Sequence, residues 1–238
     1  MEDSSFGRLI GVLVSPGKTF RSIAERPTWL VPFLVLMALS LGVGGLLMSR
    51  VDPGEMVRYQ LEKFGDRLPP EQVEKAVEDA ENVTPARRLL QTAIGLPVAA
   101  LLYAALAGVF LVIFKVLGSQ MTFKQSLSTY LYGLVPIGVV STLINLPLML
   151  ARESITPEEA MGGGVLVASP AILASEETSA VIRSLLGSLN FFTLWTLVLL
   201  AIGYRIVARV SIAVSAGTVF TLWLLYVAGK AGFAALFG

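Results

Sequence analysis

Long stretches without a charged side chain alternate with short charged segments along the chain. An α-helix needs roughly 20 largely apolar residues to cross about 30 Å of hydrocarbon. Stretches near or above that length predict spans at about 29–48, 89–114, 125–150, 184–204 and 210–229. They are apolar on all sides rather than at every second residue, which favours helices over a barrel. The pattern therefore predicts an all-α integral membrane protein, a five-helix transmembrane bundle over 29–238.

The segment before the first predicted span, residues 1–28, combines cations with an apolar face. A proline at the first helical position predicts a helix over 16–25, in which Phe20 and Ile23 share one side. We expect this N-terminal amphipathic helix to lie on the membrane surface, with packing against the flank of the bundle as the alternative. The residues that we expect at the membrane surface are Pro16, Lys18, Phe20, Arg21, Arg26, Pro27 and Trp29.

Charged segments connect the predicted spans. Residues 50–88 are expected to form a helical hairpin outside the membrane, with an acidic face over 70–82. That face could hold a divalent cation, but a solvated surface is the simpler interpretation because no ligand spacing is specific. The loop 152–183 is also acidic, and its uncharged run 161–175 is too short to span. Short loops on the N-terminal side are richer in Lys and Arg, which predicts a cytoplasmic N-terminus and an external C-terminus.

The composition supports a membrane protein and lacks two of the residue types on which many catalytic sites depend. Apolar residues make up 55% of the chain and the mean hydropathy is +0.74, which is high for a soluble domain. The chain has neither His nor Cys, so the usual zinc ligands, disulfides and thiol nucleophiles are missing. No Asp, Glu, Lys or Arg falls within the predicted spans, where such groups would mark ion or proton paths. We therefore expect no enzyme activity, cofactor or metal, and the net charge of +1 gives no reason to expect nucleic acid.

Neutral polar side chains remain within the predicted spans. Buried amides and hydroxyls in lipid seek partners on other helices, so we expect most of them to join helices rather than to bind a substrate. Internal prolines remove backbone hydrogen bonds and predict bent helices. The residues singled out for these roles are Tyr130, Tyr132, Pro136, Asn145 and Asn190.

Two short motifs precede the first and third predicted spans. They are Ser15-Pro16-x-x-Thr19-Phe20-x-x-Ile23-x-x-x-Pro27, and Thr122-Phe123-Lys124-Gln125 leading to Tyr130, Tyr132-Gly133 and Pro136. With the five-span layout, they resemble bacterial members of the Yip (Ypt/Rab-interacting protein) domain family. The resemblance implies a protein of the bacterial inner membrane. In eukaryotes the family implies organisation of secretory membranes and contact with prenylated small GTPases. This sequence lacks the acidic Tyr-Gly-Pro stretch that those members carry before the first span, which argues against GTPase binding.

These observations lead to one main functional hypothesis and two rivals. The main hypothesis is a non-enzymatic polytopic protein of the Yip type that scaffolds or assists other membrane components. Its expected partners are the lipid bilayer and either other membrane proteins or further copies of itself. The alternative is a permease or channel for a small or lipidic substrate, with Asn145, Asn190 and Tyr130 lining the path. An intramembrane enzyme has least support because no nucleophile and base pair is visible.

Overall fold

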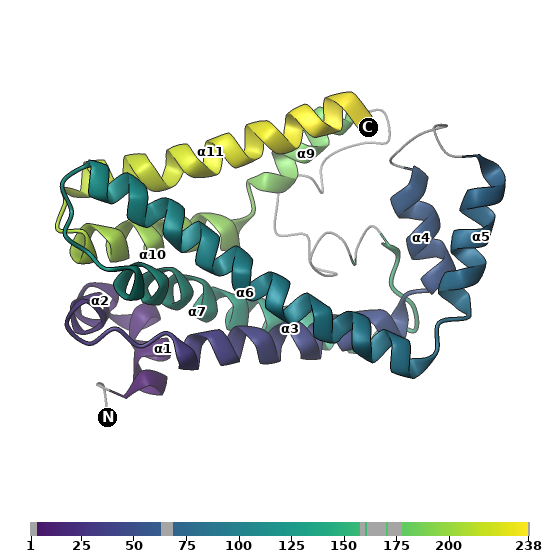
Figure 1. Cartoon of the computed structure of the whole chain (residues 1–238), viewed down its shortest axis with the longest axis horizontal. Coiled ribbons are helices and arrows are strands. Elements are labelled where there is room, and N and C mark those ends of the chain that lie inside the picture. Colours follow the sequence, from purple (N-terminus) through teal and green to yellow (C-terminus); the bar gives the residue numbers. More distant parts are fainter. Residues whose placement is uncertain (1–3, 63–68, 158–159, 161–169, 171–177, 238) are drawn as a thin grey trace. The chain divides into compact units, whose positions relative to one another are not determined.

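The computed structural model describes residues 4–62, 69–157, 160, 170 and 178–237, and the regular elements in that part are helices. The chain divides into two compact units. Unit 1 comprises Met1–Leu39, Ile94–Ser141 and Phe192–Leu224, and unit 2 comprises Ser40–Ala93, Thr142–Phe191 and Leu225–Gly238. The helices of Figure 1 are α1 (Ser5–Val14), α2 (Pro16–Glu25), α3 (Leu30–Arg50), α4 (Pro53–Glu62), α5 (Pro70–Glu81), α6 (Pro85–Val116), α7 (Phe123–Leu150), α9 (Ala180–Ser188), α10 (Phe191–Val207) and α11 (Ile212–Phe237).

Three helices are long and apolar enough to cross a membrane, in the parts Ile94–Val116 of α6, Phe123–Leu150 of α7 and Ile212–Phe233 of α11. A fourth crossing is obtained when α2 and the apolar part of α3 count as one span that bends by 119°. Helix α10 has 17 residues and is about 26 Å long, slightly less than the hydrocarbon thickness of about 30 Å. The described residues therefore contain three to four candidate spans, and the predicted number of five is not confirmed.

The helix boundaries differ from the sequence prediction at two places. The predicted span 184–204 is not one helix, because α9 ends at Ser188 and α10 begins at Phe191. The amide of Leu189 donates to the carbonyl of Leu186, three residues back instead of four, and this turn ends α9 before α10 begins. The N-terminal segment holds α1 in addition to α2, with Ser4 capping α1 through a bond from the Gly7 amide to its Oγ. Of the predicted uncharged run 161–175, all but Pro170 lies outside the described residues.

Aromatic side chains fill the core of unit 1. Phe110 and Phe114 of α6 stack on Tyr204 of α10, with ring centroids 4.5 and 5.2 Å apart. Helices α7 and α10 approach closely at Gly133, where a Cβ would stand 2.5 Å from Cδ2 of Leu200. Small residues allow such backbone approach between membrane helices. The core of unit 1 is therefore set by aromatic stacking and by glycine at the closest contact.

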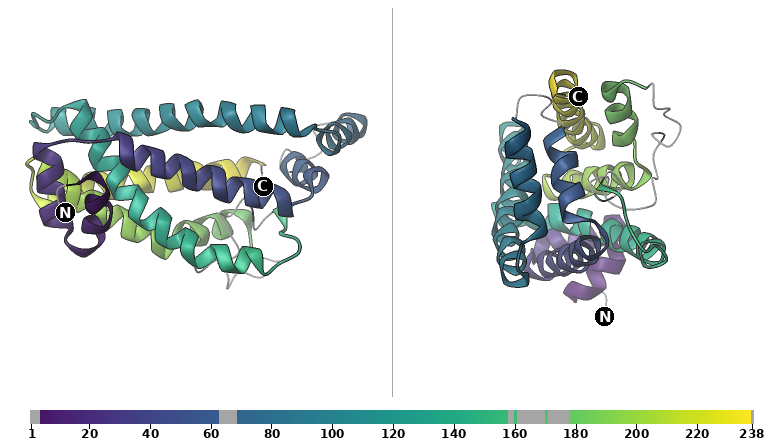
Figure 2. Two further views of the ribbon diagram at one scale, coloured as in Figure 1. Left: turned by 90° about the horizontal axis from the view of Figure 1, so that it is seen from below. Right: turned by 90° about the vertical axis from the view of Figure 1, so that its right-hand side faces the viewer.

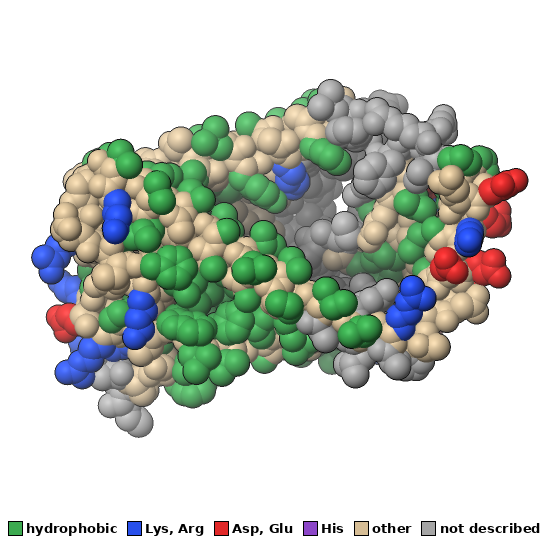
Figure 3. Space-filling view, in the orientation of Figure 1, with side chains coloured by type: hydrophobic (Ala, Val, Ile, Leu, Met, Phe, Trp, Pro, Cys, Tyr) green, Lys and Arg blue, Asp and Glu red, His purple; other side chains and the backbone are tan. Residues whose placement is uncertain are grey.

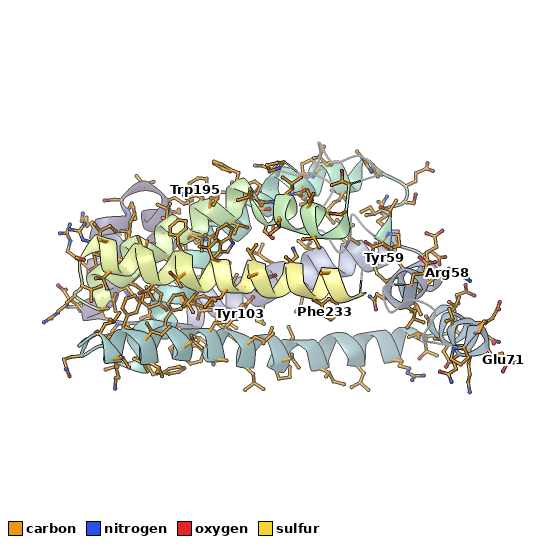
Figure 4. All side chains as sticks on the ribbon, turned by 90° about the horizontal axis from the view of Figure 1, so that it is seen from above. Arg58, Tyr59, Glu71, Tyr103, Trp195 and Phe233 are labelled. Carbon is orange, nitrogen blue, oxygen red and sulfur yellow. The ribbon has the colours of Figure 1, made fainter. Side chains whose placement is uncertain are left out.

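The described part of unit 2 contains the α4–α5 hairpin and a smaller apolar cluster. The buried members of that cluster are Val51, Met56, Met149 and Ile155. Beside this cluster, the amide of Ile155 donates a hydrogen bond to the carbonyl of Arg50 over 2.9 Å. On α5 the side chain of Glu71 is exposed and points outward (Figure 4). Unit 2 therefore combines a small core with a charged outer surface.

Candidate functional site

Arg8 of α1 lies inside unit 1 with only 2% of its surface exposed. Its guanidinium donates hydrogen bonds to the carbonyl of Arg26 over 2.8 Å, to Oγ1 of Thr28 over 3.1 Å and to Oγ of Ser22 over 2.8 Å. The buried Nε of Arg8 has no hydrogen-bond partner in the part of the chain that the structure describes. Burying a charge costs several kcal/mol unless hydrogen bonds compensate for the lost water. Arg8 thus ties α1 to α2 and to the bend before α3.

The same hydrogen bonds continue to α7 through a tyrosine. The hydroxyl of Tyr132 donates to the carbonyl of Ser5 over 3.1 Å and lies 3.1 Å from Oγ1 of Thr28. A phenol has one proton, so Thr28 is the donor in the second contact. We call Ser5, Arg8, Ser22, Thr28 and Tyr132 the Arg8 node. It holds the N-terminal hairpin of α1 and α2 on α7 (Figures 1 and 2).

Apolar contacts reinforce this docking. Phe20 and Ile23 of α2 are fully buried in one cluster with Tyr132 of α7 and Leu199 of α10. The approach is close, since a Cβ on Gly203 of α10 would stand 2.9 Å from Cε1 of Phe20. Of the two arrangements expected for the N-terminal segment, the structure shows the packed one for this face of α2. Phe20 therefore lies inside unit 1 rather than on its surface.

The other residues predicted for the membrane surface are exposed or half-buried in the structure. Lys18, Arg21 and Arg26 are exposed. Pro16 occupies the first turn of α2, and both it and Pro27 are half-buried. Trp29 is 38% exposed and makes an edge contact with Phe33, at 6.0 Å between ring centroids. The structure thus separates this predicted set into one buried anchor and an exposed basic and aromatic surface.

The residues predicted within the spans fall in both units. Tyr130 packs against Phe110 and Tyr103 of α6, with ring centroids 6.0 and 6.3 Å apart. Pro136 is buried within α7, which continues through it. Asn145 is buried in the unit 2 part of α7, and Asn190 is half-buried in the link before α10. Both asparagines have partners within the chain. Only Tyr132 of this predicted set joins the Arg8 node.

Ser126 and Arg8 bond to other helices although the sequence analysis singles out neither of them for a site. Ser126 donates to the carbonyl of Ala107 over 2.7 Å and lies 3.2 Å from the hydroxyl of Tyr204. Arg8 is one of the cations of the N-terminal segment, and its charge alone does not predict burial. The sequence did contain an indication that Arg8 is buried. Arg8 lies one helical turn before Val12 and therefore shares the apolar face of α1. A cation at such a position is informative, since Arg is seldom fully buried without partners.

The hydrogen bonds of the Arg8 node hold one segment of the chain against another. A guanidinium keeps its proton in proteins and acts as a fork of donors, and the Arg8 node supplies it with hydroxyl and carbonyl oxygens. Among the described residues, no group of three or more Asp or Glu side chains is arranged to hold a metal ion. The node can therefore fix a segment in place, and its geometry offers no reacting pair.

The chain was compared with protein-family models, curated proteins and solved structures. Neither a curated protein nor a solved structure matches the chain. The family model of the Yip1 domain matches residues 10–233, which begin within α1 and include α2 and the candidate spans. With its membrane-spanning helices, the chain is an integral membrane protein that belongs to the Yip1 domain family.

Proposed function

We propose that this protein is a non-enzymatic, polytopic component of the membrane that scaffolds or assists other membrane proteins. The observation that carries this is the use of polar groups within unit 1. The hydroxyl groups of Ser126, Tyr204 and Tyr132 all donate hydrogen bonds to carbonyls of other helices. Hydrogen bonds of this kind join helices in lipid, whereas catalysis or transport needs polar groups directed at a substrate.

The proposal includes five crossings with a cytoplasmic N-terminus and an external C-terminus. Helix α10 and the apolar part Leu30–Leu46 of α3 each have 17 residues, which is at the lower end of the length that can span. Single cysteines test the topology, because the chain has none of its own. Gln120 and Ser211 are exposed and should be labelled from the cytoplasm, whereas Ser154 should be labelled from outside. Labelling of Gln120 and Ser154 positions from the same side would contradict five crossings.

Photo-cross-linking in native membranes tests the scaffolding role. A photoreactive residue at the exposed Gln72 of α5 should give a discrete adduct with another membrane protein, and the same residue at the buried Val77 should give none. The adduct partner is then identified by mass spectrometry. Recovery of the protein only as an isolated monomer with a turnover activity would contradict the proposal.

A flux assay separates this role from the permease hypothesis. In liposomes, transport through a path lined by polar residues should fall when Asn145→Ala and Asn190→Ala are introduced into a folded protein. We expect no such flux, because both asparagines have partners within the chain and Tyr130 packs among aromatic rings.

A further inference from the structure

Helix α1 has an exposed apolar face opposite its packed one. Phe6, Ile10 and Val14 are 67%, 68% and 79% exposed and follow one another at intervals of four residues. That spacing places them along one side of the helix. The opposite side carries Arg8 and Val12, which are buried. The packed side of α1 is therefore covered by the rest of unit 1. The stripe Phe6, Ile10 and Val14 is left exposed and can contact another apolar surface.

Cations surround one end of unit 1. The exposed ones come from α2, from the ends of α6 and α7 and from the end of α10, and they are Lys18, Arg21, Arg26, Lys115, Lys124, Arg205 and Arg209. In the described part of unit 1, Glu25 is the single acid. These segments meet in space, because Nε2 of Gln125 donates to the carbonyl of Ala24 over 2.8 Å and Ala24 packs on the cluster that contains Met121 and Ala208. Figure 3 shows this concentration of basic side chains.

The stripe lies on the helix that packs against α2, which carries Lys18 and Arg21. Helices α1 and α2 pack so closely that a Cβ on Gly11 would stand 2.6 Å from Oγ1 of Thr19. Lys18 and Arg21 lie on either side of Thr19 and Phe20 in sequence and are exposed, while Thr19 and Phe20 are buried. A helix with apolar side chains on its free face and cations beside it is suited to the boundary between headgroups and acyl chains.

From charge and hydrophobicity together, we infer that this surface binds anionic phospholipid. The stripe Phe6, Ile10 and Val14 enters the acyl boundary, and the cations of three separate chain segments contact headgroup phosphates. This goes beyond the proposed scaffold role, since it assigns a lipid class to a surface that needs no protein partner. Arg8 contributes indirectly as a positioning residue, because it holds α1 in the orientation that leaves the stripe exposed.

A fluorescent reporter can measure the insertion of α1. The full chain carries one cysteine at Val14, labelled with a polarity-sensitive dye, and is placed in nanodiscs of phosphatidylcholine with increasing phosphatidylglycerol. We expect the emission to shift to the blue as phosphatidylglycerol increases, and the shift to weaken in salt, where the Debye length falls from about 10 Å at 0.1 M to about 3 Å at 1 M. The same dye at the exposed Gln72 of α5 is the control and should not respond.

Charge variants test the basic part of the surface. The combined variant Lys18→Gln, Arg21→Gln and Lys124→Gln should need at least about fivefold more phosphatidylglycerol for half of the shift, because each Lys or Arg at an anionic surface is worth about fivefold in affinity. The matched control is Arg58→Gln, Lys75→Gln and Arg87→Gln in unit 2, whose residues are equally exposed. We expect the control to behave like the unsubstituted chain.

Three results would overturn the inference. The first is an emission at Val14 that is the same in both lipids and independent of salt. The second is an equal loss of response in the control variant. The third is a blue shift that follows the number of protein copies per disc instead of the lipid, which would identify a second chain as the occupant. Since the lipid and salt series use the unsubstituted charges, they decide the question even if the charge variant does not fold.

Discussion

The two units of this protein differ in charge, and unit 1 contains the N-terminal hairpin. By sequence, unit 1 carries eight Lys or Arg and three Asp or Glu, whereas unit 2 carries ten and fourteen. In unit 1 the side chains of Arg8, Tyr132 and Ser126 make hydrogen bonds to other helices or to the bend before α3. In unit 2 the described contacts include an apolar cluster, a backbone bond between Ile155 and Arg50, and a bond from the Arg50 guanidinium to the carbonyl of Arg152. The comparison indicates that orientation of the N-terminal hairpin depends on specific polar contacts found in unit 1.

The largest expected effect is loss of the Arg8 guanidinium. Arg8→Ala removes three hydrogen bonds from a charged donor, each worth about 1.5–3 kcal/mol, but it also removes the cost of burying the charge. We expect a net destabilisation of about 2–4 kcal/mol, measured by thermal unfolding in detergent. Limited proteolysis should cut the N-terminal hairpin faster. Arg58→Ala, at an exposed position of α4 in unit 2, should change neither measurement.

A smaller effect is expected where helices approach most closely. In Gly203→Ala, the new methyl group would meet Cε1 of Phe20 at 2.9 Å and Cγ2 of Thr129 at 2.8 Å. Such overpacking typically costs about 1–3 kcal/mol. Gly229→Ala in unit 2 is the control, because nothing lies within 4 Å of its added Cβ. Equal unfolding temperatures for the two variants would show that α2 can move away from α10 without cost.

The smallest effect concerns the tyrosine of the Arg8 node. Tyr132→Phe keeps the ring but removes the bond to the carbonyl of Ser5 and the acceptor for Thr28. A net loss of about 1 kcal/mol is expected for the hydrogen bonding, again read as a lower unfolding temperature. Tyr226→Phe, at a 65% exposed position in unit 2, should leave that temperature unchanged. If both variants behave alike, the Tyr132 hydroxyl does not help to hold the hairpin.

Much of the helical organisation was predictable from the sequence, while its interruptions were not. The runs that became α6, α7 and α11 are long and apolar, so their length alone indicates a spanning helix. The break between α9 and α10 has no proline or charge to mark it, and the predicted span 184–204 ran through it. Hydropathy measures transfer into lipid and carries no information on the local backbone turn that ends α9 at Leu189.

The sequence by itself determined that this is a helical membrane protein with a basic N-terminal segment and motifs of the Yip type. Those properties depend on apolar length, charge and short motifs, which are local along the chain. Only the tertiary structure decided that Arg8 is buried, that Phe20 packs on Gly203, and that the exposed face of α1 carries apolar side chains. These outcomes required residues distant in sequence to meet, because the free energy of burying a charge depends on which oxygens surround it.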